Sequence, residues 1–185
     1  MKTIKIDIAL IIVCLTGLAY GATYTYQHTF QAYYELPTMF IDLNINTLTS
    51  SVFLVIMLIT VSCLLMHFTI RKISAQEIHV GFLVSLGLIV IVLAMYCGYA
   101  SAATKKEYMI VKQEKELYVV VTPYKDNLVI APLDIKNNTI KPKFQTIEMK
   151  DAKDTEIIKF EHGITVKKLK NSNELKKEIV QKATQ

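Results

Sequence analysis

Charged side chains are scarce in the first 104 of the 185 residues, which hold only four basic and four acidic residues. The other 17 basic and 12 acidic residues lie at or after Lys105, so the net charge of +5 belongs to the C-terminal part. This uneven distribution excludes a single soluble domain, a disordered chain and a coiled coil. It predicts an integral membrane protein with a small polar domain at its C-terminus.

Cysteine and arginine are also scarce. The three cysteines, Cys14, Cys63 and Cys97, lie in apolar segments, and the 81 residues from Lys105 to Gln185 have none. A disulfide-rich scaffold is therefore excluded. The same C-terminal part has 17 lysines and no arginine, which argues against a nucleic-acid partner. Its positive charge suits ordinary solubility, or diffuse attraction to anionic lipid headgroups or wall polymers.

Motifs of the common catalytic and metal-binding sites are absent. The sequence has no Gly-x-Ser-x-Gly, Walker loop, His-Glu-x-x-His, Cys-x-x-Cys or EF-hand loop. The only histidine after Lys105 is His162, in a predicted turn over residues 161–163, and such a histidine is typical of a solvated surface. We therefore expect a protein that is not an enzyme and that has no catalytic residues, cofactor or metal.

Three apolar segments predict transmembrane helices over about residues 4–24, 50–70 and 80–103, within a membrane domain over residues 1–104. Residues 52–70 and 80–103 carry no formal charge, and about 20 such residues cross the hydrocarbon core of a bilayer. The first segment is weaker, because only 13 residues are apolar and Asp7 precedes them. It fits either a retained helix or a cleaved secretory signal that ends near Gly21.

Basic residues predict the orientation of these segments. Those outside the C-terminal part are Lys2, Lys5, Arg71 and Lys72, whereas the loop over residues 21–47 has none. Positive charge in short loops stays in the cytoplasm. We therefore expect a multi-pass protein of the plasma membrane, with a cytoplasmic N-terminus and an extracytoplasmic C-terminal domain. Lys105 and Lys106 argue for the opposite orientation, but long tails count for less in this rule.

Small residues recur at the spacing that lets two membrane helices approach closely. They are Gly17, Gly21, Ala94, Gly98 and Ala102. They predict a parallel crossing of the first and third helices, within one chain or between protomers, although such patterns also arise by chance. Asp7 and His67 are the ionisable residues of the spans, where they would form an intramembrane polar site or simply reach water near the cytoplasmic ends.

After residue 104 the pattern changes to short β-branched and aromatic runs separated by turn signals. Leu117, Val119 and Val121 alternate with other residues, as in a half-buried strand. Residues 105–185 therefore predict a soluble domain of five to seven strands, an antiparallel barrel or sandwich, that ends in a helix over about residues 173–183. The expected strands lie near residues 108–112, 117–122, 128–131, 139–141, 144–149, 156–160 and 164–169.

The complete prediction is an α-helical membrane protein with three transmembrane helices, a small antiparallel β-domain and a terminal helix. We expect it to bind a protein partner or an envelope component, as an accessory subunit, an immunity or exclusion protein, or a sensor-like module. Tyr118, Tyr124 and Phe144 lie beside turn or polar residues and are the predicted binding face. Other expected partners are membrane lipid and a second copy of the chain, and the lysine-rich composition is typical of a low-GC bacterium.

The alternative function is an oligomeric channel or transporter subunit that uses Asp7 and His67. A membrane enzyme ranks last, because no catalytic group is found.

Overall fold

The computed structural model describes residues 8–43, 76–113, 116–152 and 155–167. The chain divides into two compact units. The helical unit consists of Met1–Ala32 and Thr38–Ala103, and the sheet unit consists of Tyr33–Pro37 and Thr104–Gln185. Asp7 and His67, the predicted intramembrane polar residues, lie outside the described residues.

The helical unit contains α1 (Ile8–Tyr33), the short 3-10 helix η1 (Thr38–Phe40) and most of α3 (Gln76–Thr104). α1 continues well beyond residue 24, because no proline or glycine follows Gly21 until Pro37. The Thr25 and Thr29 hydroxyls donate to carbonyls four residues earlier, at 2.8 Å each, so these polar groups are satisfied within the helix.

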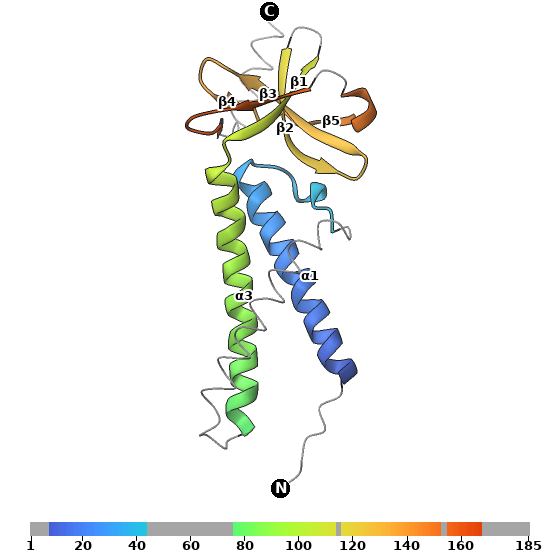
Figure 1. The fold of residues 1–185 in the computed structure, drawn as a ribbon, viewed down its shortest axis with the longest axis vertical. Helices are drawn as coiled ribbons and strands as arrows, with labels where there is room; N and C mark the ends of the chain where they lie inside the picture. The colour runs from blue at the N-terminus through green and yellow to red at the C-terminus, as the bar shows by residue number, and fades with distance from the viewer. Residues whose placement is uncertain (1–7, 44–75, 114–115, 153–154, 168–185) are drawn as a thin grey trace, which may run out of the picture. The chain divides into compact units, whose positions relative to one another are not determined.

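α1 and α3 lie side by side and run in the same direction (Figure 1). They approach closely at Gly98, where a Cβ atom would collide with the Tyr26 carbonyl oxygen and lie 3.2 Å from Thr29 Cβ. Ala22 and Val90 are buried together, with Leu18, Ile91 and Ala94 packed around them. Gly98 therefore lets the two backbones approach closely, and apolar side chains fill the contact around Ala22 and Val90.

Two glutamines of α1 hold the segment that follows it. The Gln27 side chain donates to the Asp42 carbonyl at 2.9 Å and accepts from the Asp42 N–H at 3.2 Å. One turn later, Gln31 Nε2 donates to the Phe40 carbonyl at 2.9 Å. Backbone groups of this irregular segment thus find partners on the helix.

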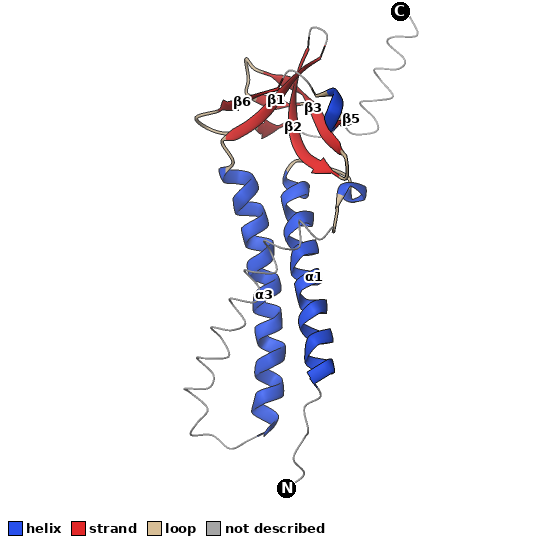
Figure 2. Ribbon diagram, turned by 45° about the vertical axis from the view of Figure 1, so that its right-hand side comes forward, coloured by secondary structure: helices blue, strands red, loops and turns tan. Residues whose placement is uncertain are grey.

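The sheet unit contains one seven-stranded mixed sheet (Figure 2). Its strands are β1 (Glu107–Gln113), β2 (Glu116–Tyr124), β3 (Asn127–Asp134), β4 (Thr139–Ile140), β5 (Gln145–Glu148), β6 (Thr155–Lys159) and β7 (Thr165–Val166), with the 3-10 helix η2 (Met149–Asp151) after β5. The strand order is β6-β1-β2-β3-β4-β7, and β5 pairs with β3. Each strand expected from the sequence overlaps one of these strands.

The register divides the sheet into two faces, because residues that pair across antiparallel strands point to the same side. The Tyr108 face consists of Tyr108, Ile110, Val119, Val129, Ala131 and Ile140, all of them buried. The Val111 face consists of Val111, Val120, Leu128 and Ile130, with Tyr118, Ile147 and Ala152 packed against them. Both faces of this small sheet are therefore apolar.

Tyr34 joins the sheet unit from far away in the sequence. Its side chain is fully buried (0% exposed), and its hydroxyl lies 3.0 Å from that of Tyr108, 74 residues later. The Tyr108 hydroxyl donates to the Lys105 carbonyl at 3.1 Å, so its oxygen accepts from Tyr34. Phe160 packs edge-on against the Tyr108 ring, with 5.9 Å between ring centres. Tyr34 is thus part of the core of the sheet unit.

Burial changes the titration of this cluster. Burial raises the pKa of the Tyr34 hydroxyl, and its hydrogen bond to Tyr108 raises it further. Burial also raises the pKa of Tyr108. It lowers the pKa of Lys105, whose ammonium lies 4.9 Å from the centre of the Tyr108 ring. The tyrosines are therefore held in their neutral form, in which they hydrogen-bond to each other.

The predicted fold class is wrong. The described residues contain two long helices, of which one segment, Ser85–Thr104, is long and apolar enough to cross a membrane. The C-terminal half of α1 is rich in threonine, tyrosine and glutamine, which lower its hydropathy. The sheet is mixed, because β4 and β7 are parallel. A multi-pass protein is therefore not supported, and the helices predicted over residues 50–70 and 173–183 lie outside the described residues.

Gly98→Ala should destabilise the helix pair by about 1–3 kcal/mol, because the new methyl group forces α1 and α3 apart. Gly17→Ala is the matched control, since a Cβ at Gly17 meets nothing within 4 Å. Thermal unfolding in detergent, followed by circular dichroism, measures the difference. Equal midpoints for the two variants would contradict the packing at Gly98.

Tyr34→Phe should cost about 1 kcal/mol of stability through the lost hydrogen bond. It should also make the stability less sensitive to high pH. An unfolded tyrosine ionises near pH 10, whereas buried Tyr34 keeps its proton, so stability is full below about pH 10 and falls above it. Denaturant unfolding from pH 7 to 11 should therefore show a shallower decline for Tyr34→Phe than for the unmodified chain.

Tyr118→Phe is the control for this measurement, because its hydroxyl makes an exposed bond of 3.0 Å to Glu116 Oε2. Lys105 is present in each variant and in the unmodified chain, so its contribution to the pH dependence is the same in all the curves that are compared. Parallel pH curves for Tyr34→Phe and the unmodified chain would show that Tyr34 does not carry the effect.

Candidate functional site

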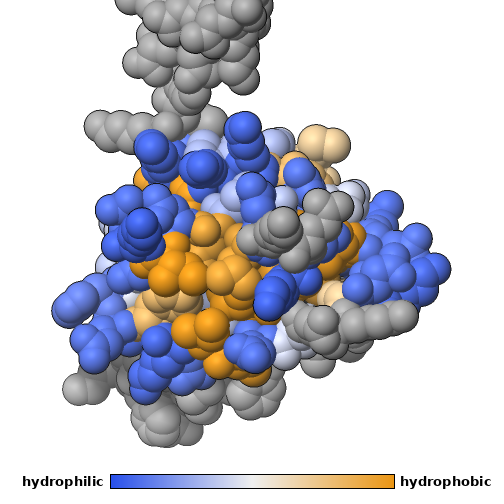
Figure 3. Space-filling model, turned by 90° about the horizontal axis from the view of Figure 1, so that it is seen from above, coloured by the Kyte–Doolittle hydropathy of each residue, from blue (hydrophilic) through white to orange (hydrophobic). Residues whose placement is uncertain are grey.

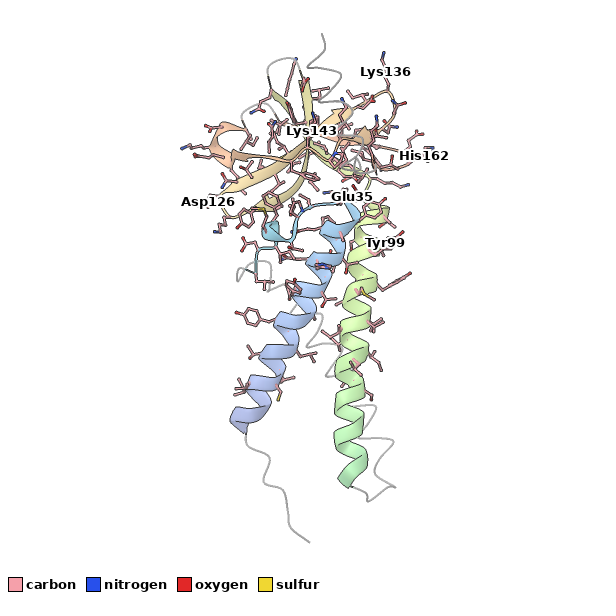
Figure 4. All side chains as sticks on the ribbon, turned by 180° about the vertical axis from the view of Figure 1, so that it is seen from behind. Glu35, Tyr99, Asp126, Lys136, Lys143 and His162 are labelled. Atoms are coloured by element: carbon pink, nitrogen blue, oxygen red, sulfur yellow. The ribbon has the colours of Figure 1, made fainter. Side chains whose placement is uncertain are left out.

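The sheet unit shows no arrangement of catalytic groups among its described residues. No group of three or more His, Cys, Asp or Glu side chains could hold a metal ion in the described part of the chain. His162 is exposed in the turn before Gly163, and Figure 4 places it on the other side of the sheet unit from Asp126. Gly163 has a φ of 70°, and a Cβ there would lie 2.9 Å from the Lys105 carbonyl oxygen, so this turn serves the fold.

Acidic side chains of the sheet unit serve local structure. The Asp134 carboxylate accepts from Asn137 Nδ2 at 2.9 Å and from the Lys136 N–H at 3.1 Å, in the turn between β3 and β4. The hydrogen bond from Asn137 lowers the pKa of Asp134. Glu148 pairs with Lys150 at 2.6 Å, and both side chains are exposed, so this ion pair contributes little. Neither group is arranged as an acid or a base for catalysis.

The three residues of the predicted binding face do not gather on one face. Tyr118 is half-buried against the Val111 face, opposite Val111. Tyr124 pairs with Asn127 at the far end of β2 and lies on the other face, since its neighbour Pro123 is opposite Leu128. The Lys125 ammonium lies 5.3 Å from the centre of its ring. Phe144 is half-buried just before β5. Tyr118 therefore packs on the surface described next, and Tyr124 does not.

The residues predicted for helix packing have different surroundings. Gly98 lies against the α1 backbone, and a Cβ at Gly21 would lie 3.5 Å from Ile91 Cδ1. Ala94 packs beside Val90, and Ala102 is buried. Gly17 has open space around it. The contact thus runs from the middle of both helices toward their C-terminal ends.

The Val111 face extends into exposed apolar side chains at one side of the sheet. Met109 of β1 is opposite Ile157 of β6, and both lie on this face, 38% and 72% exposed. Figure 3 shows apolar side chains gathered in the middle of the sheet unit, with polar side chains around them. Adjacent exposed apolar side chains such as Met109 and Ile157 make this part of the sheet a candidate interaction site.

β6 adds backbone groups to this surface, because it lies at the edge of the sheet. Phe160 N–H donates to the Lys106 carbonyl at 2.8 Å. Since hydrogen-bonded and non-bonded pairs alternate along antiparallel strands, Ile158 and Glu156 also face β1. The N–H and C=O groups of Thr155, Ile157 and Lys159 therefore point away from the sheet, and no strand among the described residues pairs with them. We name Met109, Ile157 and this backbone edge the β6 edge site.

The sequence did not reveal the β6 edge site. Ile157 and Ile158 are adjacent, so alternation alone does not show which one faces the core. The pairing with β1 decides it, because Ile158 is opposite buried Tyr108 and Ile157 is opposite Met109. The only available signal was an apolar pair in a short strand flanked by charged residues.

Two observations thus characterise the chain, an apolar helix segment and a sheet edge with exposed apolar side chains. Comparison with models of known protein families, with curated proteins and with solved structures gave no match to this chain.

Proposed function

We propose that the chain is a membrane-anchored binding protein without enzymatic activity, whose sheet unit binds a protein through the β6 edge site. The observation that carries this proposal is the 72% exposure of Ile157 beside backbone groups that pair with no strand in the described part of the chain. Covering one such side chain contributes about 1.5–3 kcal/mol. Soluble sheets usually protect their edges, so an exposed apolar edge favours a binding role.

The surface of α3 supports the membrane anchor. Only 22% of the segment Ser85–Thr104 is buried. Its exposed large apolar side chains are Leu88, Ile89, Val92, Leu93, Met95, Tyr96 and Tyr99. Figure 4 shows Tyr99 projecting from α3 away from α1. A helix in the core of a soluble protein would bury such residues, whereas lipid solvates them.

Basic residues support a plasma membrane location with the sheet unit outside the cytoplasm. α1 and α3 are parallel, so their N-terminal ends lie at the same end of the helical unit. The segments that precede the two helices carry Lys2, Lys5, Arg71 and Lys72. Because positive flanks stay in the cytoplasm, the C-terminal ends of both helices lead outward. Lys105 and Lys106 follow α3 and act against this orientation, but they belong to a longer folded unit, which counts for less.

A cysteine introduced at Thr146 tests this orientation. Thr146 is exposed on β5, and residues 105–185 contain no cysteine. We expect Thr146→Cys to react with a membrane-impermeant maleimide in intact cells, at the same level as after permeabilisation. The unmodified chain, with its three native cysteines, gives the background. Labelling only after permeabilisation would place the sheet unit in the cytoplasm and contradict the orientation.

A photo-reactive amino acid at Ile157 tests binding at the β6 edge site. We expect it to cross-link to a protein in native membranes, because Ile157 projects from the edge. The same amino acid at Thr146 is the matched control, as that exposed residue lies on β5. Absence of any protein adduct at Ile157, at expression equal to the control, would contradict the proposed function.

A further inference from the structure

We propose that the protein bound at the β6 edge site is a second copy of this chain, whose β6 pairs antiparallel with the first to form one continuous sheet. This inference rests on the proposed function and names its partner. Such a pair is symmetric, with the same edge on both subunits. Each Ile157 would then be covered by the other copy.

The β6 edge differs from the other edges of the sheet. β7 has two residues, and short edge strands resist pairing. β5 has four residues with polar Gln145, Thr146 and Glu148, and the last of these is bound to Lys150. β6 has five residues and carries an exposed isoleucine at its centre. Among the described edge strands it is the longest, and it is the one with a large exposed apolar side chain at its centre, although Glu156 and Lys159 beside it are charged.

The backbone fixes which registers two β6 strands can adopt. The outward groups belong to Thr155, Ile157 and Lys159, so these residues of one copy must face the same set in the other. Centring the pair on Ile157 places Ile157 opposite Ile157, and Thr155 opposite Lys159. Shifting the centre to Glu156 would place two carboxylates opposite each other, which is unfavourable. The register centred on Ile157 is therefore free of like-charge contacts within β6.

The same register continues the apolar surface across the pair. Met109 lies next to Ile157 on the Val111 face. In the paired sheet the order across the junction becomes Met109, Ile157, then Ile157 and Met109 of the second copy. The two most exposed apolar positions of β1 and β6 are thereby joined in one stripe. A partner with a different sequence would need its own apolar residue at this position, whereas a second copy supplies it.

Disulfide trapping in native membranes tests this pairing with the full chain. The Cα atoms of Ile157 in the two copies would lie about 5.5 Å apart, within the range of a disulfide. We expect Ile157→Cys to form a reducible dimer after mild oxidation, several-fold above the background. That background is set by the unmodified chain and by Thr146→Cys, which lies on β5. Substitution at these exposed positions leaves the core intact, so failure to fold does not explain a negative result.

Mixed pairs test the register. Thr155→Cys and Lys159→Cys should each stay at background when expressed alone, and should form a mixed dimer when co-expressed with different tags. A homodimer of Thr155→Cys as abundant as that of Ile157→Cys would overturn the antiparallel register.

The result that overturns self-pairing is Ile157→Cys at the level of Thr146→Cys. If the photo-reactive amino acid at Ile157 then captures a different protein, the second copy is excluded and the proposed function stands. If it captures no protein, both proposals fail.

Discussion

The hydrogen bond between the Tyr34 and Tyr108 hydroxyls joins segments 74 residues apart inside one core. Each buried hydroxyl needs a partner, since leaving one without a hydrogen bond costs about 1–3 kcal/mol. Tyr108 also donates to the Lys105 carbonyl, at the point where α3 has ended and β1 is about to begin. The residues after α1 are therefore a structural part of the sheet unit, and a fragment that starts at Lys105 lacks part of its core.

Tyr34 packs on the side of Tyr108, and the two faces of the sheet differ in how completely their side chains are buried. The Tyr108 face is buried throughout, whereas the Val111 face leads from buried Val111 to exposed Met109 and Ile157. Since β6 is the outermost described strand on this side of the sheet, its outward backbone groups lie next to these apolar side chains. Hydrogen-bonding capacity and apolar surface thus coincide at one edge, a combination that suits the addition of another strand.

The helical unit follows a different physical rule. Contact between α1 and α3 depends on Gly98, which admits the Tyr26 carbonyl where a larger residue would collide. The opposite side of α3 keeps large apolar side chains exposed, which the lipid of the proposed membrane anchor would solvate. The close backbones at one side of α3 and the exposed apolar side chains at the other both support the proposed membrane anchor.

The sequence by itself determined the separation between an apolar part and a lysine-rich part, and the approximate positions of all seven strands. Local patterns suffice for these, because charge and alternation are properties of short segments. It did not determine the mixed sheet, the length of α1 or the number of apolar helices that qualify as spans. A parallel pair such as β4 with β7 depends on long-range contacts that local alternation does not encode.

The candidate site shows the same division. Tyr118, Tyr124 and Phe144 were chosen for their turn and polar neighbours in the sequence, yet strand pairing separates Tyr118 from Tyr124. The exposure of Ile157 and the burial of Tyr34 were decided only by the tertiary structure. The physical reason is that side-chain burial depends on which strand lies opposite and which strand is last, and both follow from pairing between distant segments.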